Sequence, residues 1–144
     1  MAFISISITK NHPLILGKGG FGRQLADWLS AEGWGEAEFL DDSAPGCVGG
    51  LRDYADPKLL KPGRPAFVAL GDNALRVELL QKLAAAGYDT PVFISDMAAV
   101  SPSAVLEPGC VILPQAYVGA DAHLGVGCII NGGAIVDHDA VLGR

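Results

Sequence analysis

The sequence is poor in positive charge and in charged residues generally, and it lacks long apolar runs. Lys and Arg number 10 against 16 Asp and Glu, a formal net charge of −6 over 144 residues. Clustered Lys and Arg drive binding to nucleic-acid phosphates, so this balance predicts no nucleic-acid partner. No apolar stretch approaches the ~20 residues that a membrane-spanning helix needs, which predicts no membrane partner.

Cysteine is also scarce, and the N-terminus lacks the features of a secretion signal. The three cysteines match no zinc-binding spacing, so neither a disulfide framework nor a metal site is expected. The start has no basic segment before an apolar core and no small-residue cleavage site. Instead Ile4, Ile6 and Ile8 alternate with polar residues, the period of a half-buried strand over residues 3–9. We therefore expect a cytoplasmic protein.

The residues that are present divide the chain near residue 97 into two parts. The first part alternates short apolar runs with helical stretches. We expect helices over 20–32 and 74–86 and strands over 13–16, 38–40, 66–70 and 91–94. Strand and helix in alternation predict a parallel sheet that binds ligands at the carboxyl ends of its strands. Residues 1–97 are therefore predicted to form an α/β, Rossmann-like domain.

Residues 98–144 follow a strict period of six. Small residues recur from Ala98 to Ala140, and aliphatic residues recur two places later from Val100 to Leu142. Neither the 3.6-residue period of a helix nor the 2-residue period of a strand explains this pattern. It is typical of a parallel β-helix in which three hexapeptides make a triangular coil, so 98–144 give about 2.6 coils. Because no capping segment follows, we interpret the sequence as part of a longer protein, C-terminally truncated.

A glycine loop predicts that the domain at residues 1–97 is a nucleotide- or nucleotide-sugar-binding domain. The stretch Gly17-Lys18-Gly19-Gly20-Phe21-Gly22 follows the first strand and opens the first helix, where backbone N–H groups can approach a pyrophosphate. Asp41 and Asp42 follow about 20 residues later, a position that suits contacts with a ribose or base. The alternative is a tight turn that only lets helix and strand pack.

Two further clusters are candidates for chemistry. Gly71-Asp72-Asn73 follows the third strand, with Arg76 one turn into the next helix, and would either contact the ligand or cap that helix. On the solenoid, His138 stands between Asp137 and Asp139, and an imidazole with a pKa near 6.5 suits general-base chemistry. The alternative is a solvated histidine at a corner of the coil.

Other solenoid residues are given structural roles. His123 has only Asp121 as an acidic neighbour in the sequence, which favours a structural role. Cys110 and Cys128 are 18 residues apart, so they are expected to stack one coil above the other as space-filling residues.

A glycine-loop domain joined to hexapeptide repeats, with the segment Asn131-Gly-Gly-Ala-Ile-Val-Asp-His138-Asp139, resembles the bacterial sugar acetyltransferases of the sialic-acid O-acetyltransferase (NeuD) type. The pattern is most similar to the enzymes that N-acetylate nucleotide-linked amino sugars, as in bacillosamine and perosamine synthesis. The resemblance covers nearly the whole chain from about His12. It implies a left-handed β-helix, a homotrimer and acetyl-CoA as co-substrate.

The resemblance also implies roles for individual residues. His138 is the general base, Asp139 orients it, and Asn131 is a nearby polar residue. Substrate contacts are implied at Gly17, Gly19, Gly20, Gly22, Asp41, Asp42, Gly71 and Asp72. Family members often carry histidine where this chain has Phe21, so no contact is carried over to that side chain.

The implied reaction is acetyl transfer from acetyl-CoA to the amino group of a nucleotide-linked amino sugar. One alternative is O-acetylation of a sugar or sialic acid. Another is a catalytically inert nucleotide-sugar-binding fragment, because the coils that would bind acetyl-CoA and supply an oxyanion donor lie beyond Arg144. A dinucleotide dehydrogenase, suggested by the glycine loop alone, is disfavoured by the hexapeptide tail.

Overall fold

The computed structural model describes residues 12–144, and the strand predicted at residues 3–9 lies outside the described residues. Its first part comprises β1 (Leu14–Leu16), α1 (Gly20–Ala31), β2 (Glu38–Leu40), the 3-10 turn η1 (Asp53–Ala55), β3 (Ala66–Val68) and α2 (Asn73–Ala86). Its second part consists of β4 (Phe93–Ile94), β5 (Ala99–Val100), β6 (Val105–Leu106), β7 (Val111–Ile112), β8 (Tyr117–Val118), β9 (His123–Leu124), β10 (Ile129–Ile130), β11 (Ile135–Val136) and β12 (Val141–Leu142).

The first part is a small parallel sheet with the strand order β2-β1-β3. Because side chains alternate along a strand, Leu14 and Leu16 of β1 face a core shared with Leu79 and Leu83 of α2. Ile15, between them, faces the opposite core with α1. The sheet therefore has a helix over each face, which confirms the Rossmann-like α/β prediction.

The fourth predicted strand exists, but it is not part of that sheet. Phe93 and Ile94 of β4 pair in parallel with Val111 and Ile112 of β7, so β4 begins the first sheet of the solenoid. Placing 91–94 in the Rossmann-like sheet was therefore wrong. Its apolar composition suits either location, and only the pairing partner distinguishes them.

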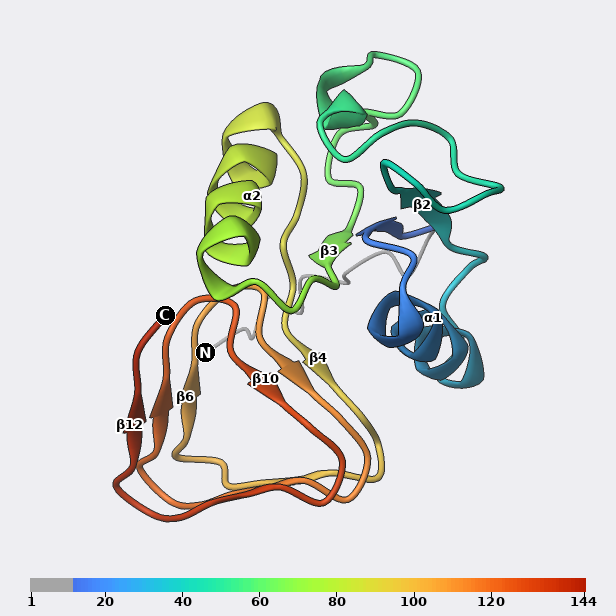
Figure 1. Cartoon of the computed structure of the whole chain (residues 1–144). Coiled ribbons are helices and arrows are strands. Elements are labelled where there is room, and N and C mark those ends of the chain that lie inside the picture. The colour runs from blue at the N-terminus through green and yellow to red at the C-terminus, as the bar shows by residue number, and fades with distance from the viewer. Residues whose placement is uncertain (1–11) are drawn as a thin grey trace, which may run out of the picture.

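The second part is a triangular solenoid with three parallel sheets, ordered β10-β7-β4, β11-β8-β5 and β12-β9-β6. The register joins residues 18 apart, such as Ile129 with Val111, so the coil length read from the period of six is confirmed. The aliphatic column fills the prism, since Ile112, Val118 and Leu124 are fully buried. From β4 through β5 to β6 the chain turns clockwise in Figure 1 while later coils lie nearer the viewer, which is a left-handed winding.

The corners of the coil share a backbone conformation. Every sixth residue from Gly109 to Asp139 has a positive φ, including the non-glycine residues Gln115, Asp121 and Asp139. Asp tolerates this left-handed region better than most residues, because its short polar side chain can hydrogen-bond locally. The turn before β12 therefore accommodates Asp139 in a conformation that most side chains avoid.

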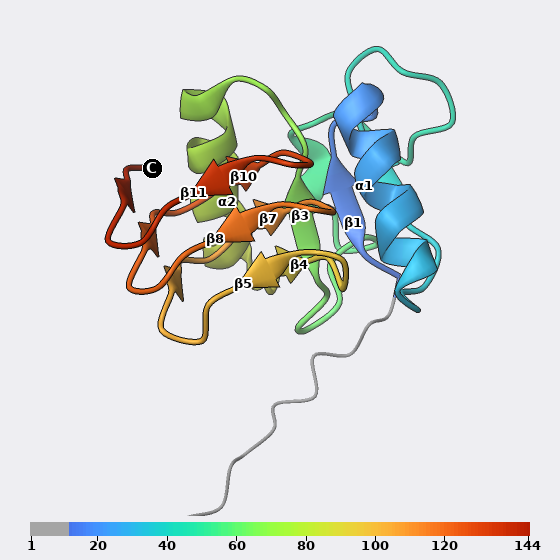
Figure 2. The same ribbon diagram turned by 90° about the horizontal axis from the view of Figure 1, so that it is seen from below.

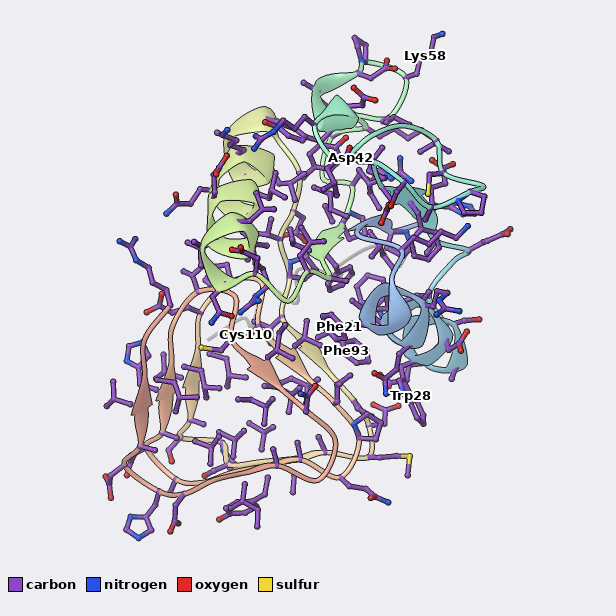
Figure 3. All side chains as sticks on the ribbon, in the orientation of Figure 1. Phe21, Trp28, Asp42, Lys58, Phe93 and Cys110 are labelled. Carbon is purple, nitrogen blue, oxygen red and sulfur yellow. The ribbon has the colours of Figure 1, made fainter. Side chains whose placement is uncertain are left out.

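A shared core holds the solenoid against the sheet. Ile15 and Phe67 of the sheet pack in one cluster with Phe93 and Val111 of the solenoid, and Phe21 of α1 packs against that cluster. Figure 3 shows Phe21 and Phe93 together between α1 and the solenoid. In Figure 2 the three coils are stacked beside the β1/β3 sheet. Within residues 12–144, no helix is long and apolar enough to cross a membrane.

Candidate active site

The glycine loop between β1 and α1 is held together by two close backbone approaches. Gly17 has a φ of +100°, and a Cβ there would stand 2.7 Å from the Ala69 carbonyl oxygen. A Cβ on Gly22 would stand 1.9 Å from the carbonyl oxygen of Gly17. Any side chain at either position would therefore displace the loop. These two glycines have a packing role, which is the alternative that the sequence left open.

Gly19 and Gly20 differ from them, because a Cβ on either would meet no atom of the described structure within 4 Å. Gly19 is also the N-cap of α1, and no side chain in the described part of the chain caps that helix. The first-turn N–H groups of α1 are consequently open to an acceptor from outside, and the helix dipole favours an anionic one.

Asp41 has a structural task. One oxygen of its carboxylate accepts a hydrogen bond from the Lys18 backbone N–H at 2.7 Å, and the other accepts from the N–H groups of Ser43 and Ala44 at 2.9 Å. These hydrogen bonds, that from Lys18 first, lower the pKa of Asp41 to about 2. The carboxylate thus remains charged and ties the glycine loop to the turn after β2.

Asp42 is exposed and less constrained. One oxygen of its carboxylate accepts a hydrogen bond from the Leu51 N–H at 2.8 Å. Figure 3 shows it above the sheet, on the side where the glycine loop and the loop after β2 meet. Of the two acidic residues, Asp42 therefore has more capacity to accept a hydrogen bond from a ligand.

A cleft of about 430 Å³ lies where the starts of α1 and α2 face β10. Its polar walls are Gln24, Asn73, Arg76 and Asn131, and its apolar walls are Phe21 and Ile129. Gly71, which the sequence assigned to the site, also lines it. The fold thus brings Gly71 and Asn131 together although 60 residues separate them in the sequence.

Asp72 does not line this cleft in the described chain. Its carboxylate accepts a hydrogen bond from the Leu75 N–H at 2.8 Å, which makes it the N-cap of α2. Of the two roles predicted for this cluster, ligand contact and helix capping, the Asp72 side chain therefore has the second. Asn73 and Arg76, which the sequence placed in the same cluster without choosing between ligand contact and capping, do line the cleft.

His138 forms a close pair with the residue that follows it. Its ring Nδ1 lies 2.6 Å from a carboxylate oxygen of Asp139, and its backbone N–H donates to the Asp137 carboxylate at 2.8 Å. The hydrogen bond to Asp139, then the charges of Asp137 and Asp139, raise the pKa of His138. With Nδ1 bonded to Asp139, Nε2 is the ring nitrogen available to accept a proton.

The His138 pair and the cleft occupy different corners of the solenoid. His138 lies in the turn between β11 and β12, whereas Asn131 directly follows β10. In Figure 1, β12 and β10 lie on different sides of the triangle. At about 3.3 Å per residue, the path between them is on the order of 20 Å. The imidazole is 70% exposed. Within one chain, His138 does not line the cleft that contains Asn131.

The remaining candidates are structural. Cys110 and Cys128 are buried one above the other, and their thiols donate to the carbonyl oxygens of Gly125 and Gly143 at 3.2 Å. Burial raises the pKa of the Cys110 thiol to about 11. Nε2 of His123 lies 2.8 Å from a carboxylate oxygen of Glu107 in the preceding coil. The sequence did not predict this partner, which is 16 positions away.

Comparison with known proteins supports a common origin for both parts of the chain. The family model described as PglD N-terminal domain matches residues 14–83. The acetyltransferase domain of PglB from Neisseria gonorrhoeae FA1090 is 34% identical, with a TM-score of 0.83 over 93% of this chain and 68% of that chain. The same domain in complex with acetyl coenzyme A matches with the same identity and TM-score over 94% of this chain and 68% of that one.

PerB from Caulobacter crescentus, in complex with CoA and GDP-perosamine, is 32% identical. Its TM-score is 0.81, over 90% of this chain and 64% of that chain. Among curated protein sequences there is no significant match.

Proposed function

Since the chain belongs to the PglD-type family of sugar acetyltransferases, we propose that it transfers the acetyl group of acetyl-CoA to the amino group of a nucleotide-linked amino sugar. The family makes the protein an acetyltransferase with acetyl-CoA as its co-substrate. The amino acceptor rests on the PerB complex with CoA and GDP-perosamine.

The observation that carries the proposal is the position of the cleft. It lies directly beside the uncapped start of α1, where Gly19 and Gly20 leave the backbone open. A diphosphate at those N–H groups would leave the attached sugar facing Gly71, Asn73 and Asn131. In this arrangement Asp42 lies on the nucleoside side, whereas Gly17, Gly22, Asp41 and Asp72 contribute by holding the loop and α2 in shape.

In the proposed reaction, His138 is the general base. Its Nε2 takes a proton from the sugar amine as the amine nitrogen attacks the thioester carbonyl, so that a C–N bond forms. The C–S bond then breaks, and the imidazolium of His138 returns the proton to the departing sulfur, so that CoA leaves as the thiol. Asp139 holds Nδ1 and stabilises the imidazolium that forms. No covalent enzyme intermediate is needed.

We further propose that the chain works as a homotrimer, with His138 of one protomer serving the cleft of its neighbour. The support is geometric, because His138 is exposed and lies at a different corner from Asn131. Two outward residues near it, Ile135 and Val141, are 76% and 78% exposed, which suits burial against another protomer. The division of the chain into a nucleotide-sugar domain, predicted at 1–97, and a β-helix, predicted at 98–144, also remains a proposal, with β4 counted in the β-helix because it pairs with β7.

The test incubates the chain with acetyl-CoA and either GDP-perosamine or a UDP-linked amino sugar, and follows the acetylated product by mass spectrometry. The variant His138→Ala should lose activity by at least about 100-fold, the usual contribution of a general base. His123→Ala is the matched control, because His123 is also an exposed solenoid histidine beside a carboxylate.

Full activity of His138→Ala would overturn the general-base role. An ester-linked, alkali-labile acetyl group on the product would show O-acetylation instead. Binding of the nucleotide sugar without any acetyl transfer by the unmodified chain would favour the inert-fragment alternative.

A further inference from the structure

Two polar residues in the cleft, Asn73 and Arg76, take no part in the proton transfer of the proposed reaction. Asn73 begins α2, immediately after its N-cap, and Arg76 lies one turn later. Both line the cleft that contains Asn131. Asn73 is exposed, whereas Arg76 is only 7% exposed. A buried arginine beside an exposed amide raises the question of what the arginine holds in place.

The guanidinium of Arg76 binds three acceptors from different parts of the chain. Its Nε donates to the carbonyl oxygen of Gly127 at 2.7 Å, which connects α2 to the solenoid. One terminal nitrogen donates to the Leu70 carbonyl oxygen at 2.8 Å, and the other donates to Oδ1 of Asn73 at 2.8 Å. In the described part of the chain Arg76 forms no ion pair, so its hydrogen bonds all go to neutral oxygens.

This arrangement fixes which way the Asn73 amide faces. A guanidinium has only donors, so the amide oxygen must be the atom that faces Arg76. The NH2 group of Asn73 then faces away from the guanidinium, and within residues 12–144 it has no hydrogen-bond partner. The cleft therefore presents a donor at this position, next to the open backbone of Gly71.

We propose that Asn73 is a substrate-binding residue that donates a hydrogen bond to an oxygen of the sugar or its phosphate, and that Arg76 is the positioning residue that fixes its amide. The proposal rests on the proposed function, because it assigns a contact within the same nucleotide-sugar cleft. The cleft would then prefer a ligand that places an acceptor oxygen opposite the Asn73 NH2 group over a ligand that places only a donor there.

The variant Asn73→Asp separates donor from acceptor at constant size. A carboxylate still accepts the Arg76 hydrogen bond, and an acidic residue in the first turn of α2 favours that helix. It has no N–H to donate, however, and it would repel a phosphate. We expect about tenfold weaker binding of GDP-perosamine or a UDP-linked amino sugar by calorimetry, whereas Asn73→Ala should weaken binding about threefold to tenfold.

Gln81→Glu is the matched control. It makes the same amide-to-carboxylate change on α2, but outside this cleft. The Gln81→Glu variant should bind the nucleotide sugar as tightly as the unmodified chain does. A loss of affinity in this control would show that any added negative charge on α2 weakens binding.

Arg76→Lys tests the positioning role. An ammonium group cannot reach all three acceptors in the fork geometry of a guanidinium, so the Asn73 amide becomes free to rotate. Sugar affinity should fall about threefold, with the KM for acetyl-CoA unchanged. In the Asn73→Ala background, Arg76→Lys should cause no further loss of affinity, because its effect acts through the absent amide.

If the Asn73→Ala and Arg76→Lys variants each weakened nucleotide-sugar binding and the double variant lost affinity by the product of the two factors, the positioning role of Arg76 would be overturned. If Asn73→Asp bound the nucleotide sugar as tightly as the unmodified chain, the role of Asn73 would be overturned. Melting temperatures of all variants identify any loss that comes from unfolding. If the unmodified chain bound neither nucleotide sugar, the proposed function itself would fail, so the two failures are distinguishable.

Discussion

Nδ1 of His138 lies 2.6 Å from Oδ2 of Asp139, although the two residues are adjacent in the chain. Neighbouring side chains in an extended strand point to opposite sides. Here Asp139 has a positive φ of +60° at the corner before β12, and its carboxylate meets the imidazole that precedes it. The turn of the solenoid is thus the feature that builds the pair.

The first prediction concerns Asp139→Asn. Because the hydrogen bond to the Asp139 carboxylate is the main cause that raises the pKa of His138, replacing that carboxylate with a neutral amide should lower the pKa toward its ordinary value. A general base must be unprotonated, so the acid limb of the kcat/KM profile should move to lower pH. The weaker base should also lower the plateau rate by about tenfold or more. Asn tolerates the positive φ, so the fold should be retained.

Asp137→Asn is the control for charge alone. Asp137 raises the pKa of His138 through its charge but accepts from the backbone N–H, not from the ring. Asp137→Asn should therefore also move the acid limb to lower pH, with a smaller loss of rate than Asp139→Asn. If Asp139→Asn left the acid limb of the kcat/KM profile unchanged, the assignment of that limb to His138 would be contradicted.

The second prediction separates the glycines of the loop. Gly22→Ala should lower the free energy of unfolding by about 3 kcal/mol or more, because its Cβ would stand 1.9 Å from the Gly17 carbonyl oxygen. Gly20→Ala should leave it unchanged or raise it by up to about 1 kcal/mol, because a Cβ there meets open space in the described structure. Urea denaturation measures both.

Gly20→Ala should nevertheless weaken nucleotide-sugar binding, since its methyl group would obstruct approach to the α1 backbone. Equal affinity of this variant and the unmodified chain would place the diphosphate elsewhere.

The third prediction concerns acid stability and Asp41. Its pKa falls from 3.8 to about 2 in the folded protein. A lowered folded-state pKa contributes stability above pH 3.8 that is lost as the pH falls toward 2. Allowing for solvent screening of this partly exposed group, the contribution is about 1 kcal/mol. Unfolding free energies of Asp41→Asn and the unmodified chain should therefore differ at pH 7 and converge near pH 2; a constant difference would contradict it.

The fourth prediction concerns thiol reactivity. Cys110 and Cys128 are 0% and 9% exposed, and desolvation raises the pKa of both thiols. Only the thiolate reacts readily with a disulfide reagent. Under native conditions one thiol per chain, that of Cys47, should react quickly, and Cys47→Ser should abolish that phase. Rapid labelling of Cys110 would show that the prism opens.

The periodic features of the fold could be predicted from the sequence. The small and aliphatic columns determine a coil of 18 residues, because each buried side chain must stack on its equivalent in the next coil. The helix that begins at Gly20 and the strand at Glu38–Leu40 were likewise predicted with nearly their observed limits. These features depend on interactions between residues at regular, short spacing.

Only the tertiary structure decided which of the predicted site residues reach the cleft. The carboxylates of Asp41 and Asp72 accept hydrogen bonds from backbone N–H groups. Arg76 is held by the carbonyl oxygen of Gly127, 51 positions away, and donates to the amide oxygen of Asn73. The NH2 group of Asn73 is therefore left available to donate to a ligand. The partner of β4 was decided in the same way. Such choices depend on which distant backbone groups come within about 3 Å of a side chain, and a local pattern holds no information on that.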